Sequence, residues 1–329
     1  MSIARARHIF ACTLLVLGSA PAIRAHTEWV NLLPRLHAGQ TLCYHVTYHS
    51  DKQVQADSPA VSASQPSDAK IEVHALLRIE VLSVQPHGKA FAVHARARFQ
   101  VLSSDSTSKN PGLELPSPQI QREDPDDKSV EFTLFPDGHV DDVKGLDTLF
   151  PEQQQAWQEW LSRFSVGVAL PAPRLKIAQK WKSEVPEASP SAIAGLRWTR
   201  ESTYVRNEPC RTVNMTVQGE LVPSDAEPDT CAVILTTATL KQRSAPQSAT
   251  PEAFKVRELR TAGSAHGKNR VITYISLTTG LLVRATEEAN QDMDVTVAKA
   301  DGSNRVHYNV SAKSNSEVVL VSEIPLTHP

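Results

Sequence analysis

The sequence predicts a mainly β protein built on a large curved antiparallel sheet, which is either a half-barrel or two related β units, with one central amphipathic helix. Three observations predict it. Apolar and polar residues alternate with a period of two through most of the chain, Gly and Pro turns separate these runs, and only residues 151–165 show a helical period. The expected organisation is a leader at 1–25, an N-terminal β unit at 26–150, the helix at 151–165 and a C-terminal β unit at 166–329. The two β units are either separate or one continuous domain.

The clearest local prediction is a β-hairpin over residues 70–101. Its first half reads "KIEVHALLRIEVLSV", in which every second residue from Ile71 to Val81 is apolar. The turn "QPHG" follows, and "KAFAVHARARFQV" then places apolar residues at alternate positions from Phe91 to Val101. Such alternation is typical of two antiparallel strands with one buried face and one solvated face.

A second hairpin phrase occurs twice, as "VEFTLFPDGHVDDVKG" at 130–145 and "VITYISLTTGLLVRAT" at 271–286. Each copy has an aromatic residue, a glycine six residues later and an apolar residue two further on, namely Phe132, Gly138 and Val140, and Tyr274, Gly280 and Leu282. Two explanations remain open. Any strand that ends at a glycine turn resembles another, or the chain contains a duplicated β unit.

The predicted helix begins near Pro151, a residue that suits a first helical turn. The segment "PEQQQAWQEWLSRFSVG" spaces its apolar residues by three and four, which puts them on one face. These residues are Ala156, Trp157, Trp160, Leu161 and Phe164. The stripe is expected to pack on the sheet, as ordinary core or as one wall of a ligand pocket.

The first 25 residues resemble a secretory signal peptide. Arg5 and Arg7 precede a short apolar run, and small residues ending at Ala25 follow it. A membrane anchor is the alternative, but it needs about 20 apolar residues, and Pro21 and Arg24 interrupt the run. Loss of the three leader arginines would take the formal charge from −2 to about −5. We therefore expect an exported protein, periplasmic or extracellular, with no transmembrane segment in the mature chain and no nucleic-acid partner.

Three cysteines follow the leader, and an exported chain can form disulfides. Cys210 and Cys231 are the closest pair in sequence and the favoured bridge, while Cys43 lies in an apolar strand pattern. A simple hairpin of residues 211–222 with 231–241 would place Cys231 opposite residue 222, too far from Cys210. The bridge therefore requires that this hairpin be bent, shifted or replaced by another pairing.

Several segments resemble bacterial periplasmic lipoprotein-carrier proteins of the LolA/LppX type and other exported bacterial β proteins. The resemblance rests on the leader, the long amphipathic strands, "GLLVRATEE", "AGQTLCYHVTY" and "LPAPRLKIAQKWKSE". It implies a half-barrel sheet that holds acyl chains beneath covering helices. This chain departs from that pattern, since only one helix is predicted, and no functional residue of the family transfers to it.

Motifs for nucleotide, zinc-protease and serine-hydrolase chemistry are absent from the sequence. His45 and His49 are about 13 Å apart along one predicted strand, and His74 and His94 about 16 Å apart in the hairpin, so neither pair can share a metal. His139, Asp141 and Asp142 fit a solvated turn. No cofactor, metal or catalytic residue is expected.

The resulting expectation is a non-enzymatic protein of the cell envelope that sequesters an apolar or lipid-like molecule between sheet and helix. The candidate pocket residues are Phe91, Phe99, Trp157, Trp160 and Phe164. A structural or interaction module that binds another envelope protein through a sheet edge or the long loops is the alternative. A hydrolase with a dispersed site is a third.

Overall fold

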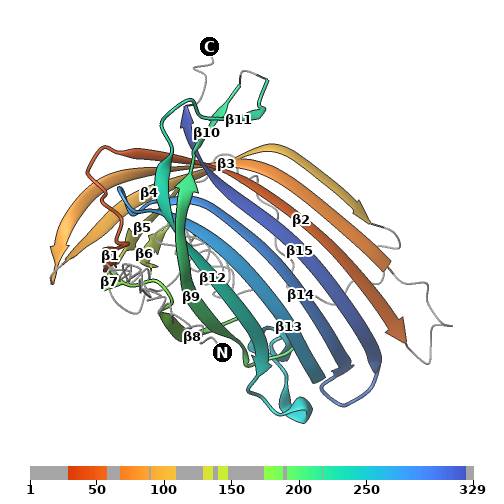
Figure 1. The fold of residues 1–329 in the computed structure, drawn as a ribbon. Coiled ribbons are helices and arrows are strands. Elements are labelled where there is room, and N and C mark those ends of the chain that lie inside the picture. The colour runs from red at the N-terminus through yellow and green to blue at the C-terminus, as the bar shows by residue number, and fades with distance from the viewer. Residues whose placement is uncertain are drawn as a thin grey trace, which may run out of the picture.

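The computed structural model describes residues 29–57, 67–88, 90–108, 129–135, 140–146, 174–187, 191–216 and 218–323. These residues form one large curved sheet, in which the long strands bend along their length (Figure 1). The predictions of a mainly β protein and of a large antiparallel sheet are confirmed. Within the described residues the sheet is open, because the strands at its two ends do not pair with each other.

The main strand order of the sheet is β6 (Val140–Lys144), β5 (Ser129–Leu134), β4 (Ala90–Ser108), β3 (Ser67–His87), β2 (Thr41–Asp57), β15 (Val306–Glu323), β14 (Leu282–Lys299), β13 (Leu259–Ser276), β12 (Asp229–Gln242), β9 (Leu196–Cys210) and β8 (Lys180–Pro186). All of these neighbours are antiparallel. The small antiparallel hairpin of β10 (Val213–Met215) and β11 (Leu221–Pro223) joins the sheet through β10, which pairs in parallel with β15.

A separate two-stranded sheet of β1 (Val30–Asn31) and β7 (Arg174–Leu175) packs on the large sheet through Leu32 and Leu175. Regular helix among the described residues is limited to the 3-10 turn η3 (Pro246–Ser248) and the four-residue α2 (Glu252–Lys255). The predicted helix at 151–165 lies outside the described residues. The central amphipathic helix therefore stays a prediction.

The hairpin predicted over residues 70–101 is confirmed as β3 and β4. The two strands pair from Ala69 opposite Ser108 to His87 opposite Ala90, with register shifts near His74 and Val81. As predicted, the alternate apolar residues share one face, and Leu77, Ile79 and Val81 are buried there. The strands are longer than the sequence pattern suggested, because pairing continues into polar residues beyond Val101.

The two copies of the repeated phrase both form hairpins, β5 with β6 and β13 with β14. Their aromatic residues nevertheless have different surroundings. Phe132 is fully buried in a large apolar cluster, whereas Tyr274 is half-buried and packs near the disulfide on the opposite face. The shared phrase thus predicts local hairpins and does not extend to equivalent packing of side chains.

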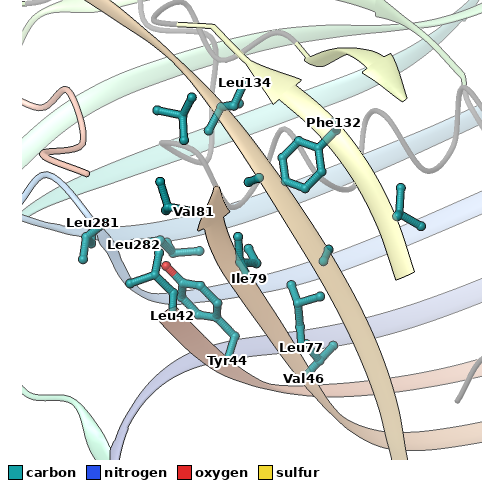
Figure 2. Packing of buried hydrophobic residues seen from close by; sticks show 14 of the residues in the cluster. Leu42, Tyr44, Val46, Leu77, Ile79, Val81, Phe132, Leu134, Leu281 and Leu282 are labelled. Atoms are coloured by element: carbon teal, nitrogen blue, oxygen red, sulfur yellow. The ribbon is translucent and has the colours of Figure 1, made fainter. Parts of the chain in front are cut away.

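One face of the large sheet, called the inner face, carries most of the core. The Tyr44 cluster gathers alternate residues of β2, β3, β4 and β5, including Leu42, Leu77 and Phe132 (Figure 2). The neighbouring Tyr204 cluster joins β8, β9, β12 and β13 to Leu32 and Leu175. At the other end of the strands lies the Trp198 cluster, which α2 helps to cover with Phe254.

The predicted disulfide between Cys210 and Cys231 is present, with the two Cα atoms 5.7 Å apart. Of the three arrangements that the sequence left open, replacement of the hairpin is the correct one. Residues 229–242 pair with β9 instead of residues 211–222, so that Asp229 lies opposite Cys210. Cys210 ends β9 and Cys231 is the third residue of the adjacent β12, and Cys43 is buried and free.

The turn between β13 and β14 is held by two parts of the chain, the segment that precedes β2 and Asp229 at the start of β12. Arg35 N–H donates to the Thr279 carbonyl at 2.8 Å, and Asp229 accepts hydrogen bonds from the hydroxyls of Ser276 and Thr278. Gly280 has φ +70°, and a Cβ placed on it would meet the Leu33 carbonyl and would lie 2.9 Å from the Pro34 Cα. Glycine is therefore required there for two reasons, its backbone conformation and the close approach of the 33–34 segment.

We predict that Gly280→Ala lowers the free energy of unfolding more than Gly302→Ala does. Gly302 has φ +83° but open space around its Cα, so its substitution costs only the left-handed conformation, about 1–2 kcal/mol. Gly280→Ala should cost at least about 1 kcal/mol more, because the chain at residues 33–34 must move. Urea unfolding of both variants measures the difference, and equal losses would contradict the tight turn.

Candidate functional site

The inner face changes character between its two apolar ends. Along β2 the side chains at 42, 44 and 46 belong to the Tyr44 cluster and Val54 belongs to the Trp198 cluster, yet the positions between them are Tyr48, Ser50 and Lys52. A comparable change occurs from β15 to β9, but not on β3, where Val73, Ile71 and Ala69 lie opposite Tyr48, Ser50 and Lys52. We call this strip the polar belt, and its members include Ser202, Thr236, Asn269, Glu287, Ser314 and Ser316. Thr273 lies at the edge of the belt, in register with Ala285 and Val318 and between them and Ile234 of the Tyr204 cluster.

Hydrogen bonds between strands hold part of the belt. The hydroxyls of Ser202 and Thr236 are 2.8 Å apart, and both residues are fully buried. The Asn269 amide donates to one carboxylate oxygen of Glu287, and the Ser316 hydroxyl lies 3.4 Å from the other. Strand register makes these contacts, because Glu287 lies directly opposite Ser316 on β15 and diagonally across from Asn269 on β13, which is opposite Ala289.

Other buried polar atoms on the inner face have no hydrogen-bond partner in the described part of the chain. They include the Thr273 hydroxyl, the Asn269 side-chain oxygen and the Trp181 indole nitrogen, and also the Thr261 hydroxyl, which lies beside the Trp198 cluster opposite Val297. Thr273 is only 1% exposed, so water cannot easily replace a missing partner. A buried polar group without a partner costs about 1–3 kcal/mol, and such groups in native proteins usually have a specific reason.

The residues predicted from the sequence to line a pocket have different surroundings. Phe99 is half-buried and packs against the Tyr44 cluster, so it lies on the inner face as expected. Phe91 is 62% exposed beside the β3–β4 turn. Trp157, Trp160 and Phe164 lie outside the described residues. The pocket therefore stays a prediction, and the polar belt was missed by sequence reasoning.

A signal for the belt does exist in the sequence. In "LLVRATEEANQDMDVTVAK" the apolar alternation lapses over "EEANQD" and then resumes. The lapse alone does not show that equivalent lapses on β2, β13 and β15 lie side by side. That alignment depends on the register of strands distant in sequence.

The histidines lie mainly on the opposite, outer face. Sequence spacing puts His45 too far from His49, and His74 too far from His94, to share a metal ion. The approach of His45 to His74 was not predicted, and their ring centroids are 5.8 Å apart. Register explains the approach, since His74 lies opposite Thr47, two residues from His45. Among the described residues, no three His, Cys, Asp or Glu side chains are arranged to hold a metal ion.

Burial controls the protonation of two neighbouring outer-face residues. It lowers the pKa of His45 below the ordinary value of 6.5, the positive charge of His74 lowers the pKa further, and Glu317 opposes both. Burial also raises the pKa of the Cys43 thiol to about 11, despite the opposing charge of Arg78. Cys43 thus stays protonated and unreactive at neutral pH.

We predict that His45 makes the fold less stable in acid. The unfolded chain binds a proton on this histidine near pH 6.5, but the folded protein binds it only at lower pH, so stability present above pH 6.5 is lost as pH falls. Urea unfolding at pH 7.5 and 5.5 should show a smaller acid loss in His45→Gln than in the unsubstituted protein. His266→Gln, at an exposed site, is the control. An unchanged loss in His45→Gln would contradict this assignment.

Comparison with known proteins adds little to the site. No family model matches the sequence, and no curated protein matches it. The chain is similar to a protein from Bacteroides fragilis described as exported, with a YmcC-like fold, at 10% identity and a TM-score of 0.24, covering 88% of this chain and 97% of that one. It is also similar to Pseudomonas aeruginosa OpdQ, at 8% identity and a TM-score of 0.22, covering 85% and 99%. Scores this low carry no argument about function.

Proposed function

We propose that the protein is exported and that its inner face binds an amphipathic, lipid-like molecule without changing it chemically. Export is supported by the signal-like residues 1–25 and by the disulfide between Cys210 and Cys231. Within the described residues, no helix is long and apolar enough to cross a membrane.

The observation that carries the binding proposal is the polar belt with its unpartnered atoms. A core that served packing alone would place apolar side chains across the whole inner face. Here apolar clusters flank a strip that holds the Asn269 amide oxygen without a partner, and two more unpartnered groups border it, the Thr273 hydroxyl and the Trp181 indole N–H opposite Ser202. A molecule with an apolar body and a hydrogen-bonding group would cover the clusters and satisfy these atoms.

The predicted helix fits this arrangement as the second wall of the site. Leu146 belongs to the Tyr44 cluster and Leu175 to the Tyr204 cluster, so the chain leaves and rejoins the described structure at the inner face. We propose that residues 151–165 cover this face with Trp157, Trp160 and Phe164 toward the sheet. Phe99 would contribute from the sheet side, whereas the exposed Phe91 would lie outside the buried part.

The alternative, an interaction module that pairs through a sheet edge, is less well supported. The end strand β8 is seven residues long and contains Lys180, Lys182, Glu184 and Pro186. Charges and proline on an edge strand discourage pairing with another chain. At the other end β6 has only five residues, and Asp142 has a positive φ of 52°. Both edges thus resemble protected edges rather than docking edges.

We predict that Thr273→Val reduces ligand retention while stabilising the ligand-free protein by about 1 kcal/mol, because it removes a buried hydroxyl without a partner. Native mass spectrometry of exported mature protein measures the bound mass, and urea unfolding after ligand removal measures stability. Thr236→Val is the matched control, since its hydroxyl bonds Ser202 and its loss should destabilise the protein.

Two results would contradict the proposal. One is a mature protein that carries no adduct and takes up none from a lipid extract. The other is a Thr273→Val variant that keeps as much ligand as the unsubstituted protein and loses as much stability as Thr236→Val.

A further inference from the structure

Two arginines lie directly opposite each other on the outer face of the sheet. Arg78 of β3 pairs in register with Arg98 of β4, and both side chains are exposed. Side chains opposite each other on antiparallel strands have Cβ atoms about 5 Å apart, and like charges there are unfavourable. Two other like-charged pairs lie opposite each other in the described part of the sheet, Glu72 with Asp105 and Lys241 with Arg197. Each of those pairs has a partner of opposite charge nearby, since Glu72 lies 3.2 Å from His74 and Arg197 lies 3.2 Å from Glu184.

Neither guanidinium group has an ion pair or hydrogen bond within the described structure. The nearby carboxylates pair with another arginine, Arg96, which lies 2.7 Å from Glu131 and 3.8 Å from Glu80. Cys43, opposite Arg78 on β2, is protonated, and Ser129, opposite Arg98 on β5, is uncharged. Three arginines, Arg78, Arg96 and Arg98, thus lie near two glutamates, Glu80 and Glu131, and both glutamates contact Arg96. The uncompensated positive charge is on Arg78 and Arg98.

We propose that Arg78 and Arg98 form a binding site for a phosphate group. A phosphate between the two guanidinium groups would convert their repulsion into two charge-assisted contacts, and the planar fork of arginine matches phosphate oxygens. The site is on the face opposite the polar belt. It is therefore independent of the proposed ligand on the inner face, and either proposal can fail alone.

Thermal unfolding of the mature, oxidised protein tests the site. Glycerol 3-phosphate at 10 mM should raise the midpoint by about 2–3 °C over chloride of equal ionic strength, as expected for a dissociation constant near 1 mM. Arg78→Gln/Arg98→Gln should lose this rise and, in chloride, be no less stable than the unsubstituted protein. Arg270→Gln/Arg305→Gln removes the same charge elsewhere on the surface and should keep the rise.

A second arm separates the two sources of phosphate. Sedimentation with phosphatidylglycerol vesicles that requires both arginines, without an effect of glycerol 3-phosphate, would identify a lipid headgroup as the ligand. A rise with glycerol 3-phosphate would identify a free phosphate ester. The proposal is overturned if neither occurs, or if Arg78→Gln/Arg98→Gln responds like the unsubstituted protein.

Discussion

The pairing of β2 with β15 is the contact on which the rest of the structure depends. It joins a strand near the beginning of the chain to the last one, from Asp57 opposite His307 to Cys43 opposite Val321. Because side chains alternate between faces, a slip of one residue here would turn every inner side chain of one half outward. The observed register instead places Val46 beside Val318 and Tyr48 beside Ser316. The apolar clusters are thereby continuous across the two halves, and the polar belt extends across this pairing as far as β2.

Several features follow from this continuity. The inner face must be covered at its apolar ends, and the short segments β1, β7 and α2 are positioned there by Leu32, Leu175 and Phe254. The turn at Gly280 has no room for a Cβ atom, because the chain between β1 and β2 passes directly against it. The outer face bears much of the charge, including the arginine pair, and is apolar mainly near the disulfide and near Cys43.

Local features could be predicted from the sequence because they depend on neighbours in the chain. Alternation from Ile71 to Val101 was sufficient for the β3–β4 hairpin, and the spacing of Cys210 and Cys231 suggested the bridge. The partner of β12 could not be predicted, since the sequence suggested a hairpin with residues 211–222 and left any other pairing unspecified, and only tertiary packing selects β9. For the same reason the His45 and His74 approach was missed. Phe91 was expected on a buried face from alternation alone, but the strand end leaves it exposed.

The polar belt is a candidate functional feature that also could not be predicted from the sequence, because it depends on how distant strands align. Each strand contributes one or two polar residues, which in isolation resemble ordinary surface positions. Their meaning appears only when six strands align them on the face that also carries the core. Thr273 is an example, since in the sequence it is one threonine in a strand, and in the fold it is a buried hydroxyl without a partner.

The most direct test of the central claim is thiol labelling of two matched variants. Ser314→Cys places a thiol on the inner belt, and Ser311→Cys places one on the outer face of the same strand; both serines are half-buried. Cys43 is buried with a pKa of about 11 and should remain silent. If the inner face binds the ligand, bound lipid should slow labelling at 314 and leave labelling at 311 unchanged. Equal labelling rates at 314 with and without lipid would contradict the account.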